Sequence, residues 1–307
     1  MKTIPTHRFR QFPILLGLLT ALMGGLASCS SSNGSSDSAT ESDAVQVGVL
    51  VIRDIETTRG QYEPILDYLS KQTGRPFVLV PLAQESQFLE VEQGKIDFII
   101  SNPLASVQIR RLYDTEFVAT QSLPGTGTQF AGQIIVRSDS SINQIEDLRG
   151  TRGACVSLET AAAGCLFQVL HVQENGLNPF LDFESLVEVP SQNTIVQNVI
   201  SGDVDFGFVR TGQLENMVAN GLLTDTSQVK VLDSRQDEGF TYEHTTRLYP
   251  TWPISATSSA APAVVQSVTQ ALLNIPADSP ALESAGIESF VSAVDYDAVD
   301  QLVESLQ

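Results

Sequence analysis

Two short stretches, QGKIDF (residues 93–98) and SGDVDF (residues 201–206), repeat one pattern that decides the fold. Each places a glycine, an apolar residue, an aspartate and a phenylalanine between an apolar helix pattern and a buried strand pattern. Glycine ends helices because it adopts the left-handed conformation without strain. This turn is common, so either copy alone would indicate little, but the pair predicts two lobes with the same plan.

Strand patterns alternate with helix patterns on both sides of the repeat. The predicted strands cover residues 45–51, 77–80, 96–100, 132–137, 153–157, 205–209 and 229–232. Between them apolar residues recur at helical spacing, which predicts helices near residues 62–69, 160–176, 195–200, 214–221, 262–272 and 299–306. Repeated strand–helix units predict an α/β fold in which each lobe is a mostly parallel sheet flanked by helices. We place lobe I at residues 45–130 and 239–307, and lobe II at residues 131–238.

The first residues have the composition of an export signal. Lysine and arginine precede an apolar run over residues 12–23, which LASC (residues 26–29) closes. The run is too short for a permanent membrane span. We predict a lipoprotein signal peptide over residues 1–28, lipidation at Cys29 and a disordered, serine-rich tether over residues 29–44. An ordinary signal peptide with a chance cysteine is the alternative. The mature protein is expected to be exported and lipid-anchored to a bacterial membrane, facing the periplasm or the cell exterior.

The charge is strongly negative, with 36 acidic residues against 17 lysines and arginines and a formal net charge of −19. Such a surface repels nucleic acid and anionic lipid headgroups, so we expect no nucleic-acid partner and membrane contact through the lipid anchor only. An anionic ligand would need local arginines and backbone N–H groups. We predict a monomer without cofactor or metal, because the three cysteines and three histidines lack the spacing of metal ligands.

Two cysteines besides Cys29 leave several alternatives open. Cys155 and Cys165 form either a disulfide, in an oxidising compartment, or a buried pair of free thiols. A catalytic role for Cys155 would need a base, and no histidine or aspartate stands at a recognisable partner spacing. We therefore assign no catalytic residue and predict that the chain is not an enzyme.

Several segments resemble a known family. GDVDFG (residues 202–207), the stretch over residues 134–150 and YEPILDYLS (residues 62–70) are similar to the phosphate/phosphonate (PhnD-like) periplasmic substrate-binding proteins. The resemblance spans about residues 45–307 and implies the two-lobed type II periplasmic-binding-protein fold, with crossover strands near residues 129–134 and 231–239. VRTGQLE (residues 209–215) and HTTRLYPTWP (residues 244–253) most resemble the input domains of tetrathionate-sensor histidine kinases.

Candidate ligand-binding residues lie at predicted helix N-termini and at the carboxyl ends of strands, where open α/β sheets bind ligands. They are Gln84, Ser101, Asn102, Thr160, Ala161, Ala162, Gln192, Asn193, Arg210, Thr211, His244 and Arg247. Phosphonate binders that resemble this chain often carry tyrosine, tyrosine, a Ser–Thr pair and histidine where Gln84, Ser101, Thr160 and Gln192 stand.

The two candidate arginines bind oxyanions well because a guanidinium donates bidentately and stays charged. Each has a structural alternative: a salt bridge for Arg210, and a stack on Tyr249 or Trp252 for Arg247. His244 either donates to the ligand or caps a loop. Arg53, Arg59 and Arg137 are expected to be surface or hinge residues.

These features predict a lipid-anchored solute-binding protein that captures a small oxyanion, phosphate/phosphonate-like or of sulfur, between two lobes. An ABC permease is the expected partner, to which the ligand would be delivered. The alternative is an input protein that docks on a separate membrane histidine kinase. A degenerate binding protein without a ligand is a third possibility, and an enzyme with a cleft cysteine is the least favoured.

Overall fold

The structure, a computed structural model, describes residues 44–305. The predicted signal peptide, the lipidation residue Cys29 and the predicted tether up to residue 43 lie outside the described residues. Residues 44–305 fall within one compact unit. Within this range, no helix combines the length and the apolar character that crossing a membrane requires.

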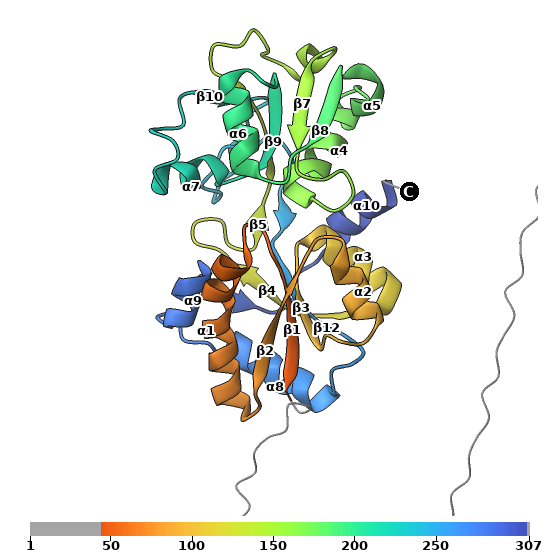
Figure 1. Cartoon of the computed structure of the whole chain (residues 1–307), viewed down its shortest axis with the longest axis vertical. Helices are drawn as coiled ribbons and strands as arrows, with labels where there is room; N and C mark the ends of the chain where they lie inside the picture. The colour runs from red at the N-terminus through yellow and green to blue at the C-terminus, as the bar shows by residue number, and fades with distance from the viewer. Residues whose placement is uncertain (1–43, 306–307) are drawn as a thin grey trace, which may run out of the picture. The chain divides into compact units, whose positions relative to one another are not determined.

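The first sheet has six strands in the order β13-β4-β12-β3-β1-β2 (Figure 1). These are β1 (Val45–Leu50), β2 (Phe77–Leu82), β3 (Phe98–Ile100), β4 (Glu116–Ser122), β12 (Pro253–Ala256) and β13 (Ser289–Val291). The helices between them are α1 (Ile55–Thr73), α2 (Ser86–Glu92), α3 (Pro103–Tyr113), α8 (Pro262–Leu273) and α9 (Pro280–Ala285), and α10 (Asp297–Ser305) follows β13.

The second sheet has five strands in the order β10-β6-β9-β7-β8. These are β6 (Gly132–Arg137), β7 (Arg152–Cys155), β8 (Ser185–Glu188), β9 (Phe206–Arg210) and β10 (Val229–Val231). Its helical segments are η2 (Ile145–Leu148), the π-helical turn η3 (Ala162–Leu166) with its continuation α4 (Phe167–Glu174), α5 (Pro179–Asp182), α6 (Gln192–Ser201) and α7 (Gln213–Ala219).

The predicted α/β architecture of two mostly parallel sheets flanked by helices is confirmed, and a few strands of opposite direction interrupt the parallel order. Parallel pairing is confined to β2-β1-β3 and to β8-β7-β9. The chain leaves the first sheet at the carboxyl end of β4 and returns there, so β12 runs against both β3 and β4. In the same way β6 enters the second sheet beside the carboxyl end of β9 and runs against it. Both sheets are therefore mixed.

A short antiparallel ribbon connects the two sheets. It pairs β5 (Gln129–Phe130) with β11 (Tyr249–Pro250). The first crossover lies where it was predicted, whereas the second lies at β11 and not at residues 231–239. Residues 232–246 still follow β6, because the N–H groups of Leu232 and Thr245 donate to carbonyls of that strand. The lobe boundaries remain a proposal, and these bonds favour a second boundary just before β11.

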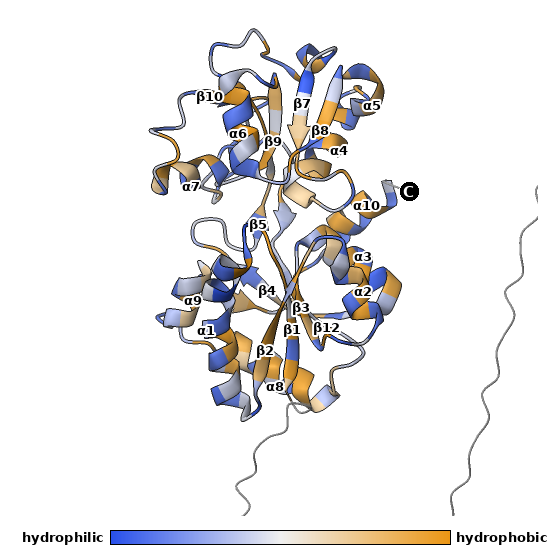
Figure 2. Ribbon diagram, in the orientation of Figure 1, coloured by the Kyte–Doolittle hydropathy of each residue, from blue (hydrophilic) through white to orange (hydrophobic). Residues whose placement is uncertain are grey.

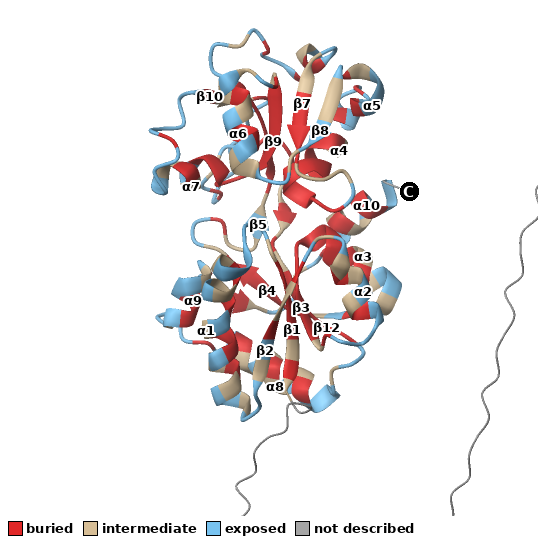
Figure 3. Ribbon diagram, viewed as in Figure 1, coloured by how far each residue is buried: buried red, intermediate tan, exposed pale blue. Residues whose placement is uncertain are grey.

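Buried hydrophobic side chains pack against each sheet, and one further cluster of them contacts elements of both sheets. Hydrophobic and buried residues coincide along the strands of both sheets (Figures 2 and 3). One cluster of buried side chains extends from β6, β9 and α4 to Leu104 and Val107 of α3 and to Val299 and Leu302 of α10. Arg110 of α3 pairs with Asp300 of α10. Helices α3 and α10 thus carry core contacts from the first sheet to the second.

The repeated aspartates perform the same task in each sheet. The carboxylate of Asp97 accepts from the N–H of Gln46 at 2.7 Å, and its own N–H donates to the Gln46 carbonyl at 2.9 Å. Asp205 makes the same pair of bonds with Arg152, both at 2.8 Å. Each aspartate therefore fixes where β3 or β9 begins against its parallel neighbour. The preceding glycines, Gly94 and Gly202, have φ values of 65° and 81°, which favour glycine.

This arrangement predicts an acid-sensitive contribution from Asp205. The Arg152 guanidinium donates to the carboxylate and holds the pKa of Asp205 below its ordinary value of 3.8, against a smaller opposing effect of burial. Because the pair is partly exposed, Asp205→Asn should lower the free energy of unfolding by about 1 kcal/mol at neutral pH. A carboxylate with a lowered pKa stabilises the fold above pH 3.8 and loses this effect as the pH falls below it. In urea unfolding, the difference in the free energy of unfolding between the variant and the wild type should become smaller as the pH falls from about 5 to about 2.5. If this difference stays constant over that pH range, Asp205 does not have this role.

Candidate functional site

The loops after the parallel strands of both sheets meet. The side-chain amide of Asn102, after β3, donates to the carbonyl of Thr160, after β7, at 3.1 Å. Asn102 also caps α3, since its Oδ1 accepts from the N–H of Ala105. The structure thus brings candidates from both sheets together at the carboxyl ends of their strands, as the argument from strand direction predicts.

Two first-sheet candidates are engaged with each other through α2. The buried hydroxyl of Ser101 donates to Gln87 Oε1 at 2.6 Å, and the Gln87 amide donates to the Gln84 carbonyl at 2.8 Å. Gln84 lies in the loop before α2, as predicted, and its buried Oε1 has no hydrogen-bond partner in residues 44–305. Ser101 therefore positions this loop, and Gln84 keeps an oxygen without a partner.

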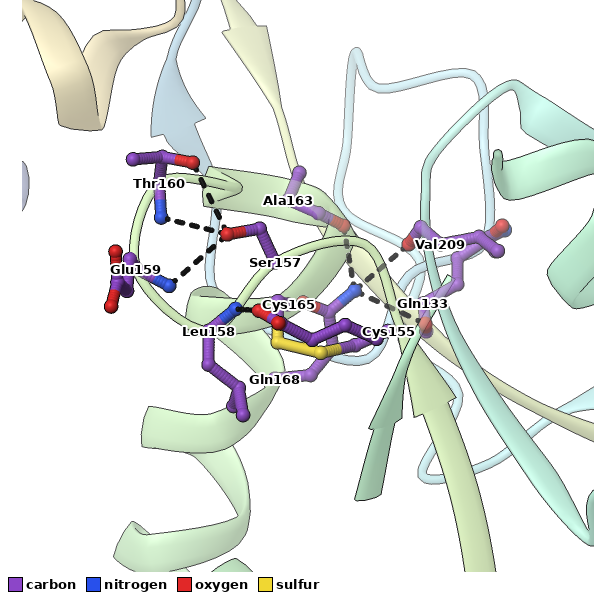
Figure 4. The surroundings of a disulfide bond; sticks show 11 residues. Gln133, Cys155, Ser157, Leu158, Glu159, Thr160, Ala163, Cys165, Gln168 and Val209 are labelled. Atoms are coloured by element: carbon purple, nitrogen blue, oxygen red, sulfur yellow. Dashed lines mark hydrogen bonds between the residues drawn. A yellow bond between two sulfur atoms is a disulfide. The ribbon is translucent and has the colours of Figure 1, made fainter. Parts of the chain in front are cut away.

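The loop before η3 is held by its own hydrogen bonds and by a disulfide (Figure 4). Ser157 Oγ accepts from the N–H groups of Glu159 and Thr160 and from the Thr160 hydroxyl. The structure joins Cys155 and Cys165 through their sulfurs, with their Cα atoms 5.0 Å apart. Since Ser157 holds Thr160 in a turn, the helix begins at Ala162 and not at Thr160.

The first turn of η3 presents backbone donors. N–H groups in the first turn of a helix have no acceptor within the helix. Here these groups belong to residues 162–164, two buried alanines and a buried glycine, whose small side chains cover little of the backbone. We refer to residues 162–164 as the η3 turn. It includes Ala162 of the predicted site, while Ala161 precedes it and donates its N–H to the Ser157 carbonyl.

A buried glutamine that sequence reasoning missed holds the η3 turn in place. The side-chain amide of Gln168 donates to the carbonyls of Gln133 on β6, Ala163 in the η3 turn and Val209 on β9 (Figure 4). A Cβ atom at Gly132 would come within 2.5 Å of this amide. The signal in the sequence is slight, since it consists of one polar residue on a helix face and one glycine at a strand start.

The N-terminus of α6 contacts the end of β9. Gln192 Oε1 accepts from the backbone N–H of Arg210 at 2.9 Å. Asn193 Oδ1 accepts from the side-chain amide of Gln213 at 2.6 Å. Thr211 exchanges two hydrogen bonds with Ala131, through its hydroxyl oxygen and its own N–H. Thr211 therefore ties β9 to the connecting ribbon, and Gln192 and Asn193 lie beside Arg210.

Arg210 carries a positive charge that is in direct contact with no carboxylate within residues 44–305. Its guanidinium makes no ion pair or hydrogen bond there, although seven other described arginines pair with carboxylates. Burial lowers the pKa of Arg210, the charge of Arg53 lowers it further, and Tyr242 and Glu215 oppose both effects. Arg53 follows β1 of the other sheet, and its guanidinium also lacks a partner within the described range. Arg53 is exposed, as expected for a surface residue, but its proximity to Arg210 was not predicted.

His244 and Arg247 make local contacts. The buried His244 Nδ1 bonds to the Thr246 carbonyl at 2.7 Å, and Nε2 lies 3.6 Å from the Asp237 carboxylate. Arg247 Nε donates to the Tyr249 hydroxyl at 3.0 Å, which raises the pKa of Arg247. These contacts match a loop cap and a structural stack, so we leave both residues out of the proposed site. Across the described part of the chain, no cluster of three or more His, Cys, Asp or Glu side chains is arranged to hold a metal ion.

Residues 47–298 match the model of one protein family, described as ABC transporter, phosphonate, periplasmic substrate-binding protein. The chain belongs to this family. The predicted recognition is therefore confirmed, and the family consists of substrate-binding proteins of transporters, not of enzymes.

Solved structures of this family have the same two-lobed fold. PhnD1 from Prochlorococcus marinus, in complex with methylphosphonate, has a TM-score of 0.71 and 16% identity, over 86% of this chain and 98% of that one. A binding-protein component of an ABC phosphonate transporter from Pseudomonas aeruginosa has a TM-score of 0.70 and 16% identity, over 86% of each chain.

A curated relative matches the sequence at higher identity. The tetrathionate sensor histidine kinase TtrS of Salmonella typhimurium is 27% identical over 236 residues, which are 75% of this chain and 39% of TtrS. The chain thus spans about two-fifths of the length of this relative.

Proposed function

We propose that the protein is a lipid-anchored extracytoplasmic receptor that captures a small oxyanion of phosphorus or sulfur between its two lobes and delivers it to an ABC permease. The observation that carries the proposal is Arg210, whose half-buried guanidinium forms no ion pair and no hydrogen bond within residues 44–305. Burying a charge without a partner is costly, and this chain has 36 acidic residues from which a partner could have come. A bound anion supplies the missing charge.

The proposed anion site consists of Arg210 and the η3 turn. A guanidinium donates to two oxygens of an oxyanion at once, and free N–H groups at a helix start favour negative charge. Both features come from the second sheet. Asn102 comes from the first sheet, so an anion that also contacts Asn102 would stabilise the arrangement in which Asn102 bonds to Thr160.

The identity of the anion is left at the level of its chemistry. The likeness to a methylphosphonate-binding structure supports a phosphorus oxyanion, and the match to a tetrathionate sensor supports a sulfur oxyanion. Phosphate, phosphonate and sulfonate groups all present oxygens with the spacing that a guanidinium and consecutive N–H groups bind. The lipid anchor at Cys29 and the monomeric state remain predictions.

A second role is favoured by the match to TtrS. A receptor with this fold could dock on a separate membrane histidine kinase in place of a permease. Neighbouring genes distinguish the two roles, because a transporter requires a permease and an ATPase, whereas a sensor requires a kinase and a response regulator.

The proposal predicts that an oxyanion stabilises the protein against heat. The Tm of anion-free protein would be measured before and after addition of each of six anions: phosphate, phosphite, methylphosphonate, sulfate, thiosulfate and tetrathionate. A ligand at about 100 times its Kd adds about 2.7 kcal/mol. For a chain of this size, that corresponds to a rise in Tm of roughly 5–10 °C. Arg75→Ala is the matched control, because it removes an exposed, unpaired arginine before β2, at the opposite end of the sheet, and should keep the response. If none of the anions raises the Tm, the proposed function is wrong and the family fold remains.

A further inference from the structure

A polar cavity of about 160 Å³ lies next to the proposed anion site. Its lining residues come from both sheets: Arg53 from the loop after β1, Asn193 from α6, and Asn216, Met217, Asn220 and Leu222 from α7 and the turn that follows. No carboxylate lines it. The cavity has room for several water molecules, and therefore for a tetrahedral oxyanion group.

Three of the four polar side chains of this cavity have N–H groups free to donate, whereas Asn220 uses its amide N–H groups on Asn216 and keeps its Oδ1 as an acceptor. Asn193 Oδ1 is already engaged by Gln213, which leaves the Asn193 amide N–H groups to donate. The oxygens of Asn216 accept from the Asn220 amide, which leaves the Asn216 amide N–H groups to donate. The Arg53 guanidinium has no partner within the described range. Three donors and no negative charge favour an anionic group over a cationic one.

Two adjacent residues of α6 connect the cavity with the proposed anion site. Gln192 accepts from the N–H of Arg210, and Asn193 lines the cavity. Arg210 itself does not line the cavity, so the two guanidiniums occupy neighbouring positions. Two cations without ion pairs at neighbouring positions, Arg210 half-buried and Arg53 exposed, favour a ligand with a negative charge at each position.

We propose that the physiological ligand carries two oxyanion groups on a short linker. One group binds Arg210 and the η3 turn, and the other enters the cavity and accepts from Arg53, Asn193 and Asn216. Met217 and Leu222 provide the apolar contacts for the linker. This inference rests on the proposed function and specifies the class of ligand for the same site.

Isothermal titration calorimetry with matched pairs of anions tests the inference. Each pair compares one head with two: methylphosphonate with methylenediphosphonate, and thiosulfate with tetrathionate. In at least one pair the two-headed anion should bind the wild type about 30-fold tighter or more, since the second group gains charge-assisted hydrogen bonds. Arg53→Ala should weaken the two-headed anion about 10-fold or more and change the one-headed anion less than about 3-fold.

Two further variants keep the test decisive. Asn216→Asp has the same shape but adds a negative charge to the cavity, so it should weaken the two-headed anion selectively. Arg75→Ala, the control, should change neither affinity. If one-headed anions bind as tightly as two-headed ones, or if Arg53→Ala weakens both alike, the inference is wrong and the proposed function stands. If no anion of either kind binds the wild type, the proposed function itself fails.

Discussion

The Arg210→Met variant is expected to be more stable than the wild type without ligand and to lose its response to oxyanions. The guanidinium of Arg210 is half-buried and forms no ion pair within residues 44–305, and methionine fills similar space without a charge that burial disfavours. We expect a gain of about 1–3 kcal/mol in the free energy of unfolding, which raises the Tm by roughly 3–10 °C. The affinity for the anion should fall about 100-fold or more, because the anion loses its charged donor. Melting curves with and without anion measure both effects.

Arg152→Met is the matched control for this experiment. It also replaces an arginine at one end of a strand of the second sheet, but that arginine pairs with Asp205. We expect it to lower the stability slightly and to leave the response to anions intact. If Arg210→Met raises the free energy of unfolding and Arg152→Met lowers it, the result supports a binding role for Arg210. A loss of stability in Arg210→Met would indicate a structural partner for Arg210, and a retained anion response would remove Arg210 from the site.

Loss of the disulfide is expected to reduce both stability and anion affinity. The bond spans 10 residues of sequence, and closing a loop of that length in the unfolded chain is worth about 2–3 kcal/mol. The Cys155→Ala/Cys165→Ala variant should therefore melt roughly 5–12 °C lower. Because the closed loop ends in the η3 turn, the affinity for the anion should fall about 10-fold. Thermal melting and calorimetry on the double variant measure these changes.

The control for the double variant is to repeat both measurements in the presence of a reductant. Adding it should leave the double variant unchanged while shifting the wild type toward it, once heating exposes the buried sulfurs. If the double variant and the wild type have equal Tm and equal affinity, the disulfide contributes neither to the fold nor to the proposed anion site.

The sequence predicts those parts of the fold that depend on local pattern. β-Branched runs locate β1 and β6, and the Gly-x-(Ile/Val)-Asp-Phe repeat locates β3 and β9 and indicates two sheets of one plan. Strands β4, β12 and β13 escaped the analysis, because β12 and β13 are short and β4 pairs only with them, after the chain has left the first sheet and returned. The path of residues 232–246 was not predicted either. Backbone hydrogen bonds hold this segment to β6, and such bonds produce no periodic pattern of apolar residues in the sequence.

In the candidate site too, local sequence patterns predict some features, whereas others depend on residues that are distant in the sequence. Strand direction correctly brings Asn102 and Thr160 together, because each follows a parallel strand. Arg53 was overlooked because its importance depends on Arg210, which comes from the other sheet. His244 and Arg247 were chosen because their side chains can donate to an oxyanion, yet both bond to residues two positions away. Short-range motifs therefore identified the family, whereas the pairing of charges required the structure.

A crystal structure of the protein with the anion that raises its melting temperature most is the most direct test of the account. We predict oxyanion oxygens within hydrogen-bonding distance of the Arg210 guanidinium and of the N–H groups of residues 162–164. An anion bound at Arg247, or elsewhere on the surface, with no contact to Arg210, would contradict it.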